Sequence, residues 1–528
     1  MVVSARKEAS DIGLSILKKG GNAFDAMVAT QLALAVAYPV AGNIGGGGFM
    51  VYRKANGDVG SLDYREKAPL KASSKMYLDK AGNIIKDMST FGAMSVGVPG
   101  TIAGIFAVHK RFGSLPLKML IEPVIFLAER GVVVTKKQRK RLENYSADLK
   151  RANGTDFFLT QGFQEGDTIK YDSLANTLKQ ILKNGRDDFY KGDTSKKLVA
   201  YIQNEGGIIS QEDLENYQAK WRPVVTFRYK DLKIISMSPP SSGGITLAQI
   251  MKMIEPFPLS KYGHNDIKTI QVITEAERRA YADRNFFLGD PDFVSIPINQ
   301  LLDSIYLSDR MKDFSFQRAT KSDSISHGSM AFLESNETTH YSIVDSFGNA
   351  VSVTTTLNGN YGSKLYCNSL GFFLNNEMDD FSAKKGIPNQ FGLTGGEANS
   401  IAPEKRMLSS MTPTIVERAG KLYMVVGSPG GATIITSVLQ TILNVYEFGM
   451  NMQEAVSAPR FHHQWLPDHI TLESDSFSKQ IKDSLKILGY KINEKNTPIG
   501  KVDAILLLKG LKKEGGADPR GDDATSGY

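Results

Sequence analysis

The sequence predicts an α+β fold in which stacked layers of β-sheet form the core and helices seal it. Residues 99–320 show mostly helical patterning broken by Pro and Gly, whereas short segments rich in β-branched residues recur through the chain. Those segments are 48–53, 58–64, 223–229, 232–237, 339–344, 350–356, 371–375, 413–418 and 421–427. Long helices in one part and strands in another favour a layered architecture.

The composition limits the kind of protein. Of the 528 residues, 41% are hydrophobic, which is ample for a large core and for more than one domain. The net charge of +7 arises from 63 basic and 56 acidic residues, a mild excess that does not demand nucleic acid. The single cysteine, Cys367, excludes an internal disulfide and any metal site built from several cysteines.

The first elements read as helices. Residues 5–19 form an amphipathic pattern that ends at a glycine pair, and Asn22 is a good cap for a second helix over 23–38. The apolar run 26–40 is too short and too polar to cross a bilayer, so it predicts a buried helix. Because residues 1–6 lack the basic-then-apolar pattern of a signal peptide, we take the chain as a mature or trimmed form.

Four further patterns invite a binding interpretation but favour a structural one. The glycines at 45–48 lack the Lys and Ser/Thr of a phosphate loop, so we expect backbone packed closely against a neighbour. The basic run 136–141 has no interleaved aromatic residues and predicts a solvated helix face. In 266–286, carboxylates interleave with arginines, which predicts a salt-bridged scaffold helix. Neighbouring His462 and His463 would point to opposite strand faces without a third ligand, so we expect no metal.

Residues 336–358 read as two strands joined by a turn, and the predicted site is arranged around them. If Val344 lies opposite Ala350, antiparallel pairing places Thr338 opposite Thr356. A threonine at a strand start, facing a second hydroxyl, is a candidate nucleophile with a helper. Two threonines on a strand surface are also common without any catalytic role, and the residues alone leave that alternative open.

The segment Glu337-Thr338-Thr339-His340-Tyr341-Ser342 resembles the self-cleavage site of the γ-glutamyltransferase family, which are N-terminal-nucleophile hydrolases. The similarity covers nearly the whole chain, including the terminal stretch 514–523, which we expect to be architectural. It implies the four-layer αββα sandwich of that superfamily. It also implies cleavage into a large subunit, 1–337, and a small catalytic subunit, 338–528, which stay together as a heterodimer in one compact unit.

Thr338 would play two parts in such a protein. A threonine hydroxyl is a poor nucleophile without a base, whereas an α-amine has an ordinary pKa of about 7.7–8.0 and is partly free base near neutrality. Only an N-terminal threonine carries both groups. We therefore expect the Glu337–Thr338 bond to break first, by attack of the Thr338 hydroxyl on the Glu337 carbonyl and hydrolysis of the ester. Thr356 is expected to hydrogen-bond the Thr338 hydroxyl or amine.

A glycine pair is the candidate for stabilising the oxyanion. Gly430 and Gly431 follow an apolar strand, 421–426, and precede a helical pattern over 432–446. Their backbone N–H groups would lie at a helix N-terminus, which favours anions. A plain strand-to-helix turn fits this pattern equally well, and the resemblance supplies the catalytic role.

Six residues are implied as the site for the amino-acid end of a substrate. Read alone they are turn, capping and ion-pair residues, although an arginine at a strand end suits a carboxylate through two parallel hydrogen bonds. The resemblance assigns the α-amine to Asn358, Glu377 and Asp380. It assigns the α-carboxylate to Arg65, Ser409 and Ser410.

The loop from about Ser382 to Gly395 resembles the lid over the bacterial γ-glutamyl pocket. Phe391 stands where the bacterial pattern usually has Tyr, and it cannot make that hydroxyl's hydrogen bond to the position of Asn358. We therefore expect poorer exclusion of water and a larger share of hydrolysis relative to transfer.

Residues and resemblance together predict an acyltransferase and amidohydrolase that needs no metal or organic cofactor. Thr338 would take the γ-glutamyl group from glutathione or another γ-glutamyl donor, and water, an amino acid or a peptide would release it. One alternative is a related acylase that cleaves glutaryl side chains from β-lactams, which would have no use for Asp380 because glutaryl lacks an α-amine. Another is a non-catalytic, unprocessed binding relative. The family suggests the periplasm or secretion, and neither nucleic acid nor a stable membrane span is expected.

Overall fold

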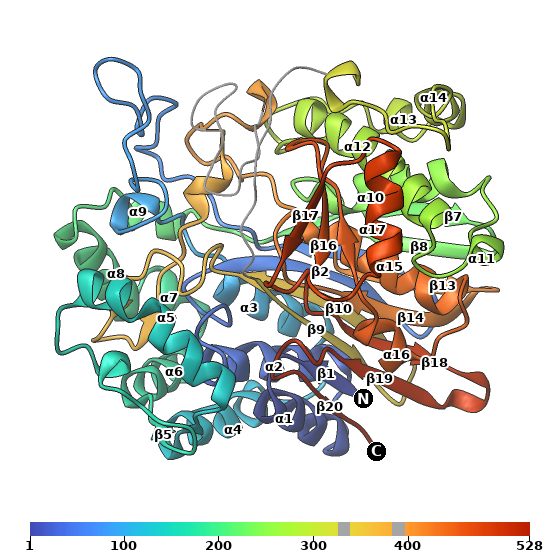
Figure 1. The fold of residues 1–528 in the computed structure, drawn as a ribbon. Helices are drawn as coiled ribbons and strands as arrows, with labels where there is room; N and C mark the ends of the chain where they lie inside the picture. The colour runs from blue at the N-terminus through green and yellow to red at the C-terminus, as the bar shows by residue number, and fades with distance from the viewer. Residues whose placement is uncertain (326–337, 383–395) are drawn as a thin grey trace.

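Two large antiparallel sheets lie face to face through the middle of the molecule, and helices cover the outer face of each (Figure 1). The computed structural model describes residues 1–325, 338–382 and 396–528. Both chain ends lie on the same side of the molecule, because the first and last strands, β1 and β20, pair with each other. The four layers form the αββα sandwich that the sequence predicts.

The first sheet contains the predicted hairpin at its centre. Its seven strands run in the order β20-β1-β9-β10-β2-β3-β6. They are β1 (Val2–Ser4), β2 (Gly47–Arg53), β3 (Val59–Asp63), β6 (Lys220–Arg222), β9 (Thr338–Val344), β10 (Ala350–Thr356) and β20 (Ala524–Ser526). The register of β9 and β10 is the predicted one: Val344 pairs with Ala350, and Thr338 pairs with Thr356.

Asp345 fixes the turn of this hairpin. Its carboxylate accepts hydrogen bonds from the backbone N–H groups of Phe347 and Asn349, at 2.9 and 2.8 Å. It also accepts one from the N–H of Ala23, the first residue of helix α2, at 2.9 Å. Turn chemistry sets strand register, and a carboxylate at a helix N-terminus is favourable, so one side chain holds the hairpin both in register and in place.

The second sheet has six strands in the order β19-β18-β14-β13-β8-β7. They are β7 (Val225–Tyr229), β8 (Leu232–Ser236), β13 (Thr414–Arg418), β14 (Lys421–Gly427), β18 (Asp503–Leu507) and β19 (Lys513–Ala517). Smaller sheets pair β4 (Val132–Val133) with β5 (Thr168–Ile169), β11 (Tyr366–Cys367) with β12 (Phe372–Phe373), and β16 (Ile470–Glu473) with β15 (Phe461–His462) and β17 (Ile492–Lys495). The predicted strand 371–375 is therefore only the two-residue β12.

The helices divide between the two outer layers. On the side of the first sheet lie α1 (Lys7–Lys18), α2 (Ala23–Ala37), α3 (Thr101–Phe112), α4 (Leu117–Arg130), α5 (Lys136–Asn153), α6 (Asp172–Asn184), α7 (Arg186–Tyr190), α8 (Asp193–Asn204) and α9 (Gln211–Glu215). On the side of the second lie α10 (Gly243–Ile254), α11 (Leu259–Tyr262), α12 (Ile267–Phe287), α13 (Ile298–Leu301), α14 (Ser304–Arg310), α15 (Thr433–Tyr446), α16 (Met452–Ser457) and α17 (Lys479–Ile487).

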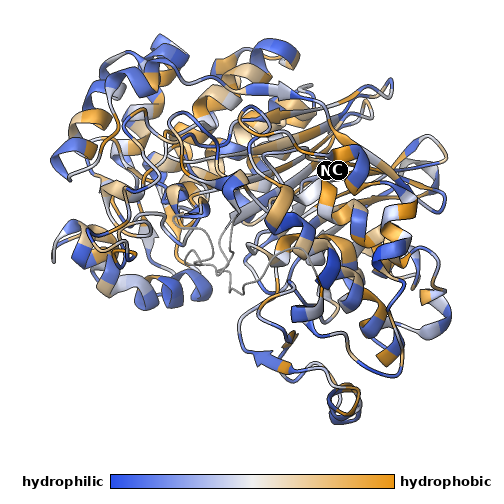
Figure 2. Ribbon diagram, turned by 90° about the horizontal axis from the view of Figure 1, so that it is seen from above, coloured by the Kyte–Doolittle hydropathy of each residue, from blue (hydrophilic) through white to orange (hydrophobic). Residues whose placement is uncertain are grey.

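Three apolar cores separate the four layers, and the alternation of strand residues feeds them. In β2, Met50 and Tyr52 pack into the core under the first helical layer, whereas Phe49 and Val51 pack into the core between the sheets. A third core lies between the second sheet and helices α10, α12 and α15. Hydrophobic residues accordingly gather in the sheets and in the helices that pack on them (Figure 2). Each fully buried Val or Phe contributes about 1.5–3 kcal/mol.

The structural interpretations of the glycine run and of the apolar helix are confirmed. A Cβ added at any residue of 45–48 would lie 2.1–2.5 Å from a backbone oxygen, so only glycine permits this packing. Helix α2 begins at a capping box between Asn22 and Asp25, and every residue in it is buried. Among the described residues, no helix is both long and apolar enough to cross a membrane.

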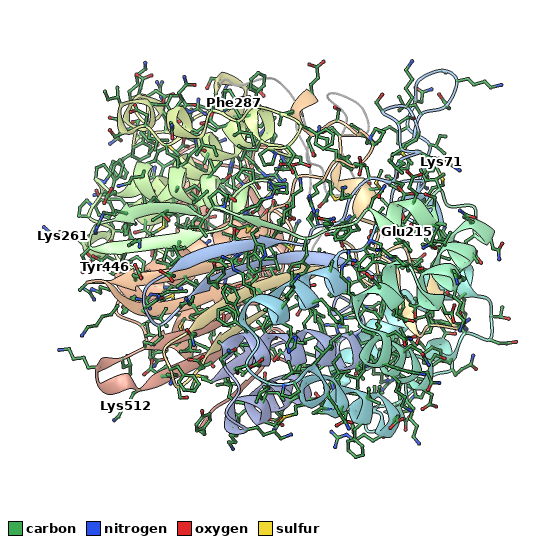
Figure 3. All side chains as sticks on the ribbon, turned by 180° about the vertical axis from the view of Figure 1, so that it is seen from behind. Lys71, Glu215, Lys261, Phe287, Tyr446 and Lys512 are labelled. Carbon is green, nitrogen blue, oxygen red and sulfur yellow. The ribbon has the colours of Figure 1, made fainter. Side chains whose placement is uncertain are left out.

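The two charged helices also behave as predicted. In α5, Lys136, Lys137 and Lys140 are exposed to solvent. In α12, Glu275 pairs with Arg279 at 2.6 Å and with Arg278 at 3.5 Å, which makes the helix a salt-bridged scaffold. Helix α12 is buried through most of its length and reaches the edge of the molecule at Phe287 (Figure 3).

Candidate active site

Thr338 is the first residue of β9, in the middle of the first sheet. Thr338 is 7% exposed, and its hydroxyl oxygen has no hydrogen-bond partner among the described residues. Buried hydroxyl groups are normally paired, and the hydroxyl of the next residue, Thr339, is unpaired as well, so it is the position of Thr338 at the strand start that makes its hydroxyl a candidate nucleophile. Glu337, on the other side of the predicted cleavage site, lies outside the described residues.

Thr356 faces Thr338 in register, as predicted, and in the uncut chain the Thr338 hydroxyl is not hydrogen-bonded to it. The Thr356 hydroxyl accepts a hydrogen bond from the backbone N–H of Asn358 at 2.6 Å. It also bonds the Glu377 carboxyl and lowers the pKa of that group. The Thr356 hydroxyl thus helps to hold the loop that follows its own strand.

His340 brings the end of the second sheet against the beginning of β9. Its imidazole lies over Gly427 of β14, where an added Cβ would be 2.3 Å from the ring. The ring nitrogens bond the hydroxyls of Thr354 and Ser342, at 2.9 and 3.1 Å. Burial lowers the pKa of His340 to about 3, so the imidazole is neutral and holds the two sheets together without acting as a base near neutrality.

Gly430 and Gly431 lie in the connection from β14 to α15, as the pattern predicted. Both have positive φ, 133° and 57°, a conformation that glycine adopts readily. The Gly430 carbonyl accepts hydrogen bonds from the N–H and hydroxyl of Thr433, at 3.1 and 2.7 Å. Tyr281 of α12 donates its hydroxyl to the Ala432 carbonyl at 2.5 Å and so fixes the turn from the other side.

Arg65 is surrounded by carboxylates. It follows β3, and its guanidinium lies 2.5 Å from both Glu377 and Asp380 and 3.5 Å from Glu66. All four side chains are buried except Asp380, whose side chain is 15% exposed. The residues that the resemblance assigned to the two ends of an α-amino acid are therefore in direct contact with each other.

The carboxylates outnumber the guanidinium, and their pKa values reflect this. Burial raises the pKa of Glu377 well above its ordinary value, and the charge of Arg65 offsets only part of the effect. Burial raises the pKa of Asp380 in the same way, although Arg65 and Arg284 both oppose the rise. Glu66, the residue after Arg65, to which we gave no role, has its pKa raised to about 8 by burial.

Asn358 turns the chain from β10 into this cluster. It has a φ of 71°, in the left-handed region that asparagine tolerates better than most residues. Its side-chain amide donates to the Asn376 carbonyl at 2.9 Å. Asn375 anchors the same loop by hydrogen bonds to Gly45 and Gly97. These bonds hold the turn that carries Glu377 and Asp380 against the glycine run 45–48.

Ser409 and Ser410 are held by residues that the sequence did not suggest. The backbone of Ser409 bonds the Pro240 carbonyl and the Ser242 N–H, at 2.9 and 2.7 Å. The Ser410 hydroxyl accepts a hydrogen bond from Arg284 of α12 at 2.8 Å. Ser242 precedes α10, and Arg284 lies in a helix that we interpreted only as scaffold. Phe391 of the predicted lid lies outside the described residues.

The fold is the αββα sandwich of the N-terminal-nucleophile hydrolase type. The structure matches that of cephalosporin acylase from Bacillus halodurans with a TM-score of 0.89, over 100% of this chain and 95% of that one. The sequence identity of that pair is 24%, so the match establishes the fold alone.

The family follows from closer relatives. The sequence model of the gamma-glutamyltranspeptidase family matches residues 9–528, and the chain belongs to this family. Glutathione hydrolase proenzyme of Escherichia coli K12 is 43% identical over 100% of this chain and 92% of that protein. The proenzyme of Pseudomonas sp. A14 is 46% identical over 96% and 88%. Gamma-glutamyltranspeptidase of Helicobacter pylori is 43% identical, with a TM-score of 0.60 over 62% of this chain and 94% of that one. The resemblance inferred from the motifs is thereby confirmed.

Proposed function

We propose that this chain is a self-cleaving glutathione hydrolase and γ-glutamyltransferase whose nucleophile is Thr338. The observation that carries the proposal is the buried, unpaired hydroxyl at the first residue of a central strand. A rigid sheet on both sides of β9 holds that hydroxyl in place, which is what a precise nucleophile requires.

Self-cleavage would come first. The Thr338 oxygen attacks the Glu337 carbonyl carbon, the C–N bond breaks, and the nitrogen takes the hydroxyl's proton. Water then hydrolyses the resulting ester and leaves chains 1–337 and 338–528. The freed α-amine, with an ordinary pKa of about 7.7–8.0, becomes the general base that the buried neutral His340 cannot be.

Turnover would repeat the same chemistry on a γ-glutamyl amide. The Thr338 oxygen bonds to the γ-carbonyl carbon while its proton passes to the α-amine and then to the departing amine. The backbone N–H groups of Gly430 and Gly431, beside the N-terminus of α15, would bind the intermediate oxyanion. Water or an amino-acid or peptide amine then attacks the ester and regenerates the hydroxyl.

The charge around Arg65 supports an α-amino acid as the group recognised. Three carboxylates, two of them buried, surround one guanidinium, and an incoming ammonium would compensate the excess at Glu377 and Asp380. The α-carboxylate would compete with these acids for Arg65 and bond Ser409 and Ser410, while Asn358 contributes an amide oxygen to the ammonium. A glutaryl group has no ammonium, so the acidic cluster disfavours the acylase alternative.

A direct experiment separates the proposal from its alternatives. Purified wild-type protein is expected to give two chains on a denaturing gel, one of which begins Thr-Thr-His-Tyr, and to cleave γ-glutamyl-p-nitroanilide in preference to glutaryl-p-nitroanilide. Thr338→Ala should remain one chain and be inactive, whereas the matched exposed substitution Thr155→Ala should change nothing. An uncut Thr338→Ala protein with normal turnover contradicts the mechanism, and an uncut, inactive wild type supports a non-catalytic relative.

The assembly and location follow from the same proposal. The two products would stay together as a heterodimer, since three neighbouring pairs of the first sheet, β20 with β1, β1 with β9 and β10 with β2, join strands from both sides of the cut. We place the enzyme in the periplasm or outside the cell, where relatives of this kind would meet extracellular glutathione. Fractionation of the source cells, with activity measured in each fraction, tests this placement.

A further inference from the structure

Arg284 is a buried cation beside the candidate carboxylate-binding serines. The residue is 3% exposed and lies in α12, which belongs to the large segment of the chain. Its three guanidinium nitrogens donate to neutral oxygens: Nε to the Ser242 hydroxyl at 3.1 Å, Nη1 to the Asn285 amide at 3.0 Å and Nη2 to the Ser410 hydroxyl at 2.8 Å.

The charge of Arg284 is not neutralised in the way its neighbours' charges are. Arg278 and Arg279, in the same helix, each pair with Glu275 and with a second carboxylate. Within the part of the chain that the structure describes, no carboxylate forms an ion pair with Arg284. A buried charge is costly unless it is paired, so a guanidinium kept here without a partner points to an anionic ligand.

The hydrogen bonds of Arg284 prepare both serines for such a ligand. A guanidinium only donates, so the Ser410 oxygen is the acceptor and its own proton remains for another acceptor. Ser242, held by the Nε group, donates its hydroxyl to the Ser409 carbonyl at 2.8 Å. One side chain therefore orients Ser410 directly and Ser409 through Ser242.

Arg65 cannot supply this charge alone. Its guanidinium already pairs with Glu377 and Asp380, so its positive charge is largely compensated within the protein. Arg284 also acts on Asp380, whose pKa it lowers. Of the two guanidinium groups, only that of Arg284 has no carboxylate of the described residues in ion-pair contact.

We propose that Arg284 is a positioning residue that makes the enzyme specific for donors with an α-carboxylate. It orients the Ser410 proton toward that carboxylate. It also supplies positive charge for the carboxylate, because the Arg65 guanidinium is already paired with Glu377 and Asp380. This inference rests on the proposed function, because it names what selects the substrate at the same site.

Two substrates separate positioning from mere scaffolding. γ-Glutamyl-p-nitroanilide carries the α-carboxylate, and 4-aminobutyryl-p-nitroanilide lacks only that group. Arg284→Gln is expected to lower kcat/KM about tenfold or more for the first, mainly through KM, and less than twofold for the second. Arg284→Lys keeps the positive charge but lacks the planar guanidinium that donates to several oxygens at once. Its kcat/KM for γ-glutamyl-p-nitroanilide should therefore lie between the values of Arg284→Gln and wild type. Arg318→Gln, an exposed arginine, is the matched control and should change neither value.

The failures can be told apart. If wild type does not cleave γ-glutamyl-p-nitroanilide, the proposed function fails and this inference fails with it. If wild type is active but Arg284→Gln lowers both substrates by the same factor, or neither, Arg284 is only scaffold. Should the glutamine variant not fold, Arg284→Lys decides: the KM for the carboxylate-bearing donor must rise while that for the other stays, and equal changes overturn the proposal.

Discussion

Two buried clusters of charge in this molecule differ in their balance. In one, Arg460 pairs with Asp518 at 2.7 Å, and Arg520 pairs with Asp518 at 3.1 Å and with Glu473 at 2.6 Å. Two guanidinium groups thus meet two carboxylates. In the cluster around Arg65, one guanidinium meets three.

The pKa values show what the difference means. Burial raises the pKa of Asp518, but its two arginines more than offset this, so the value lies below the ordinary one. At Glu377 and Asp380 burial prevails over the single guanidinium, and both values are raised. The balanced cluster is complete without a ligand and fits the architectural role predicted for 514–523. The unbalanced cluster has a charge that a substrate ammonium would complete.

The largest expected effect comes from breaking the balanced cluster. Arg460→Met leaves Asp518 with one partner fewer in a site that is 0% exposed, and should lower the free energy of unfolding by about 3–5 kcal/mol. Arg418→Met breaks an exposed ion pair with Asp231 and should cost less than about 1 kcal/mol. Urea denaturation measures both. An Arg460→Met protein that is fully stable but has lost its turnover would contradict the contrast between a structural cluster around Asp518 and a substrate-binding cluster around Arg65.

Breaking the unbalanced cluster should do the opposite. Asp380→Asn removes a carboxyl whose pKa is already raised, so the melting temperature should stay or rise. The kcat/KM for γ-glutamyl-p-nitroanilide should fall about a hundredfold, because a charged hydrogen bond to the ammonium is worth about 1.5–3 kcal/mol. The control is Asp309→Asn at an exposed site. Lost stability with retained kcat/KM is the outcome that this account cannot accommodate.

The pH dependence of stability sharpens the comparison. The pKa of Glu66 is raised from 4.5 to about 8, so its contribution to stability is full below pH 4.5 and is lost as pH rises through about 8. Between pH 5 and 8, wild type should lose on the order of 3–4 kcal/mol more than Glu66→Gln.

Asp518 provides the control for that experiment. Its pKa is lowered, so its contribution is present above the ordinary value and is lost as pH falls further. Asp518→Asn should therefore lower stability without changing its slope between pH 5 and 8. Chemical denaturation at three pH values measures both variants. Parallel curves for wild type and Glu66→Gln would remove Glu66 from the explanation.

The smallest expected effect concerns Phe391 of the predicted lid. Phe391→Tyr restores the hydroxyl of the usual bacterial pattern and should lower the ratio of hydrolysis to transfer a few-fold, an effect of about 1 kcal/mol. The ratio of free glutamate to γ-glutamyl-glycylglycine, with glycylglycine as acceptor, gives the measurement. Phe347→Tyr, at a residue that is 62% exposed, serves as control. Equal product ratios for wild type and Phe391→Tyr refute the idea.

Local signals predicted the hairpin and the close packing of the glycines. β-Branched runs on both sides of an Asp-to-Asn turn suggested the register that places Thr338 opposite Thr356 but left a slip by one residue open, and the structure shows the suggested register. The boundaries of α12 and β14 also followed from local periodicity to within a residue or two.

The contacts within the site could not be predicted in this way. The pairing of Arg65 with Glu377 and Asp380 joins residues more than 300 positions apart, and the motifs suggested separate partners for them. The hydrogen bond from Arg284 to Ser410 spans 126 positions. An arginine among carboxylates in a helix reads as part of a salt-bridge ladder, and only the fold shows that this one faces serines.

The strand order of the first sheet has a consequence for the cut molecule. Strand β1 lies between β20 and β9. A break before Thr338 would therefore leave a strand of the first fragment hydrogen-bonded on both sides to strands of the second. The next boundary, β10 with β2, would interlace the fragments again. Neither fragment could then dissociate without breaking the backbone hydrogen bonds of these strand pairs. A mixture of heavy-isotope and ordinary protein should keep its original pairings for as long as the molecules remain native.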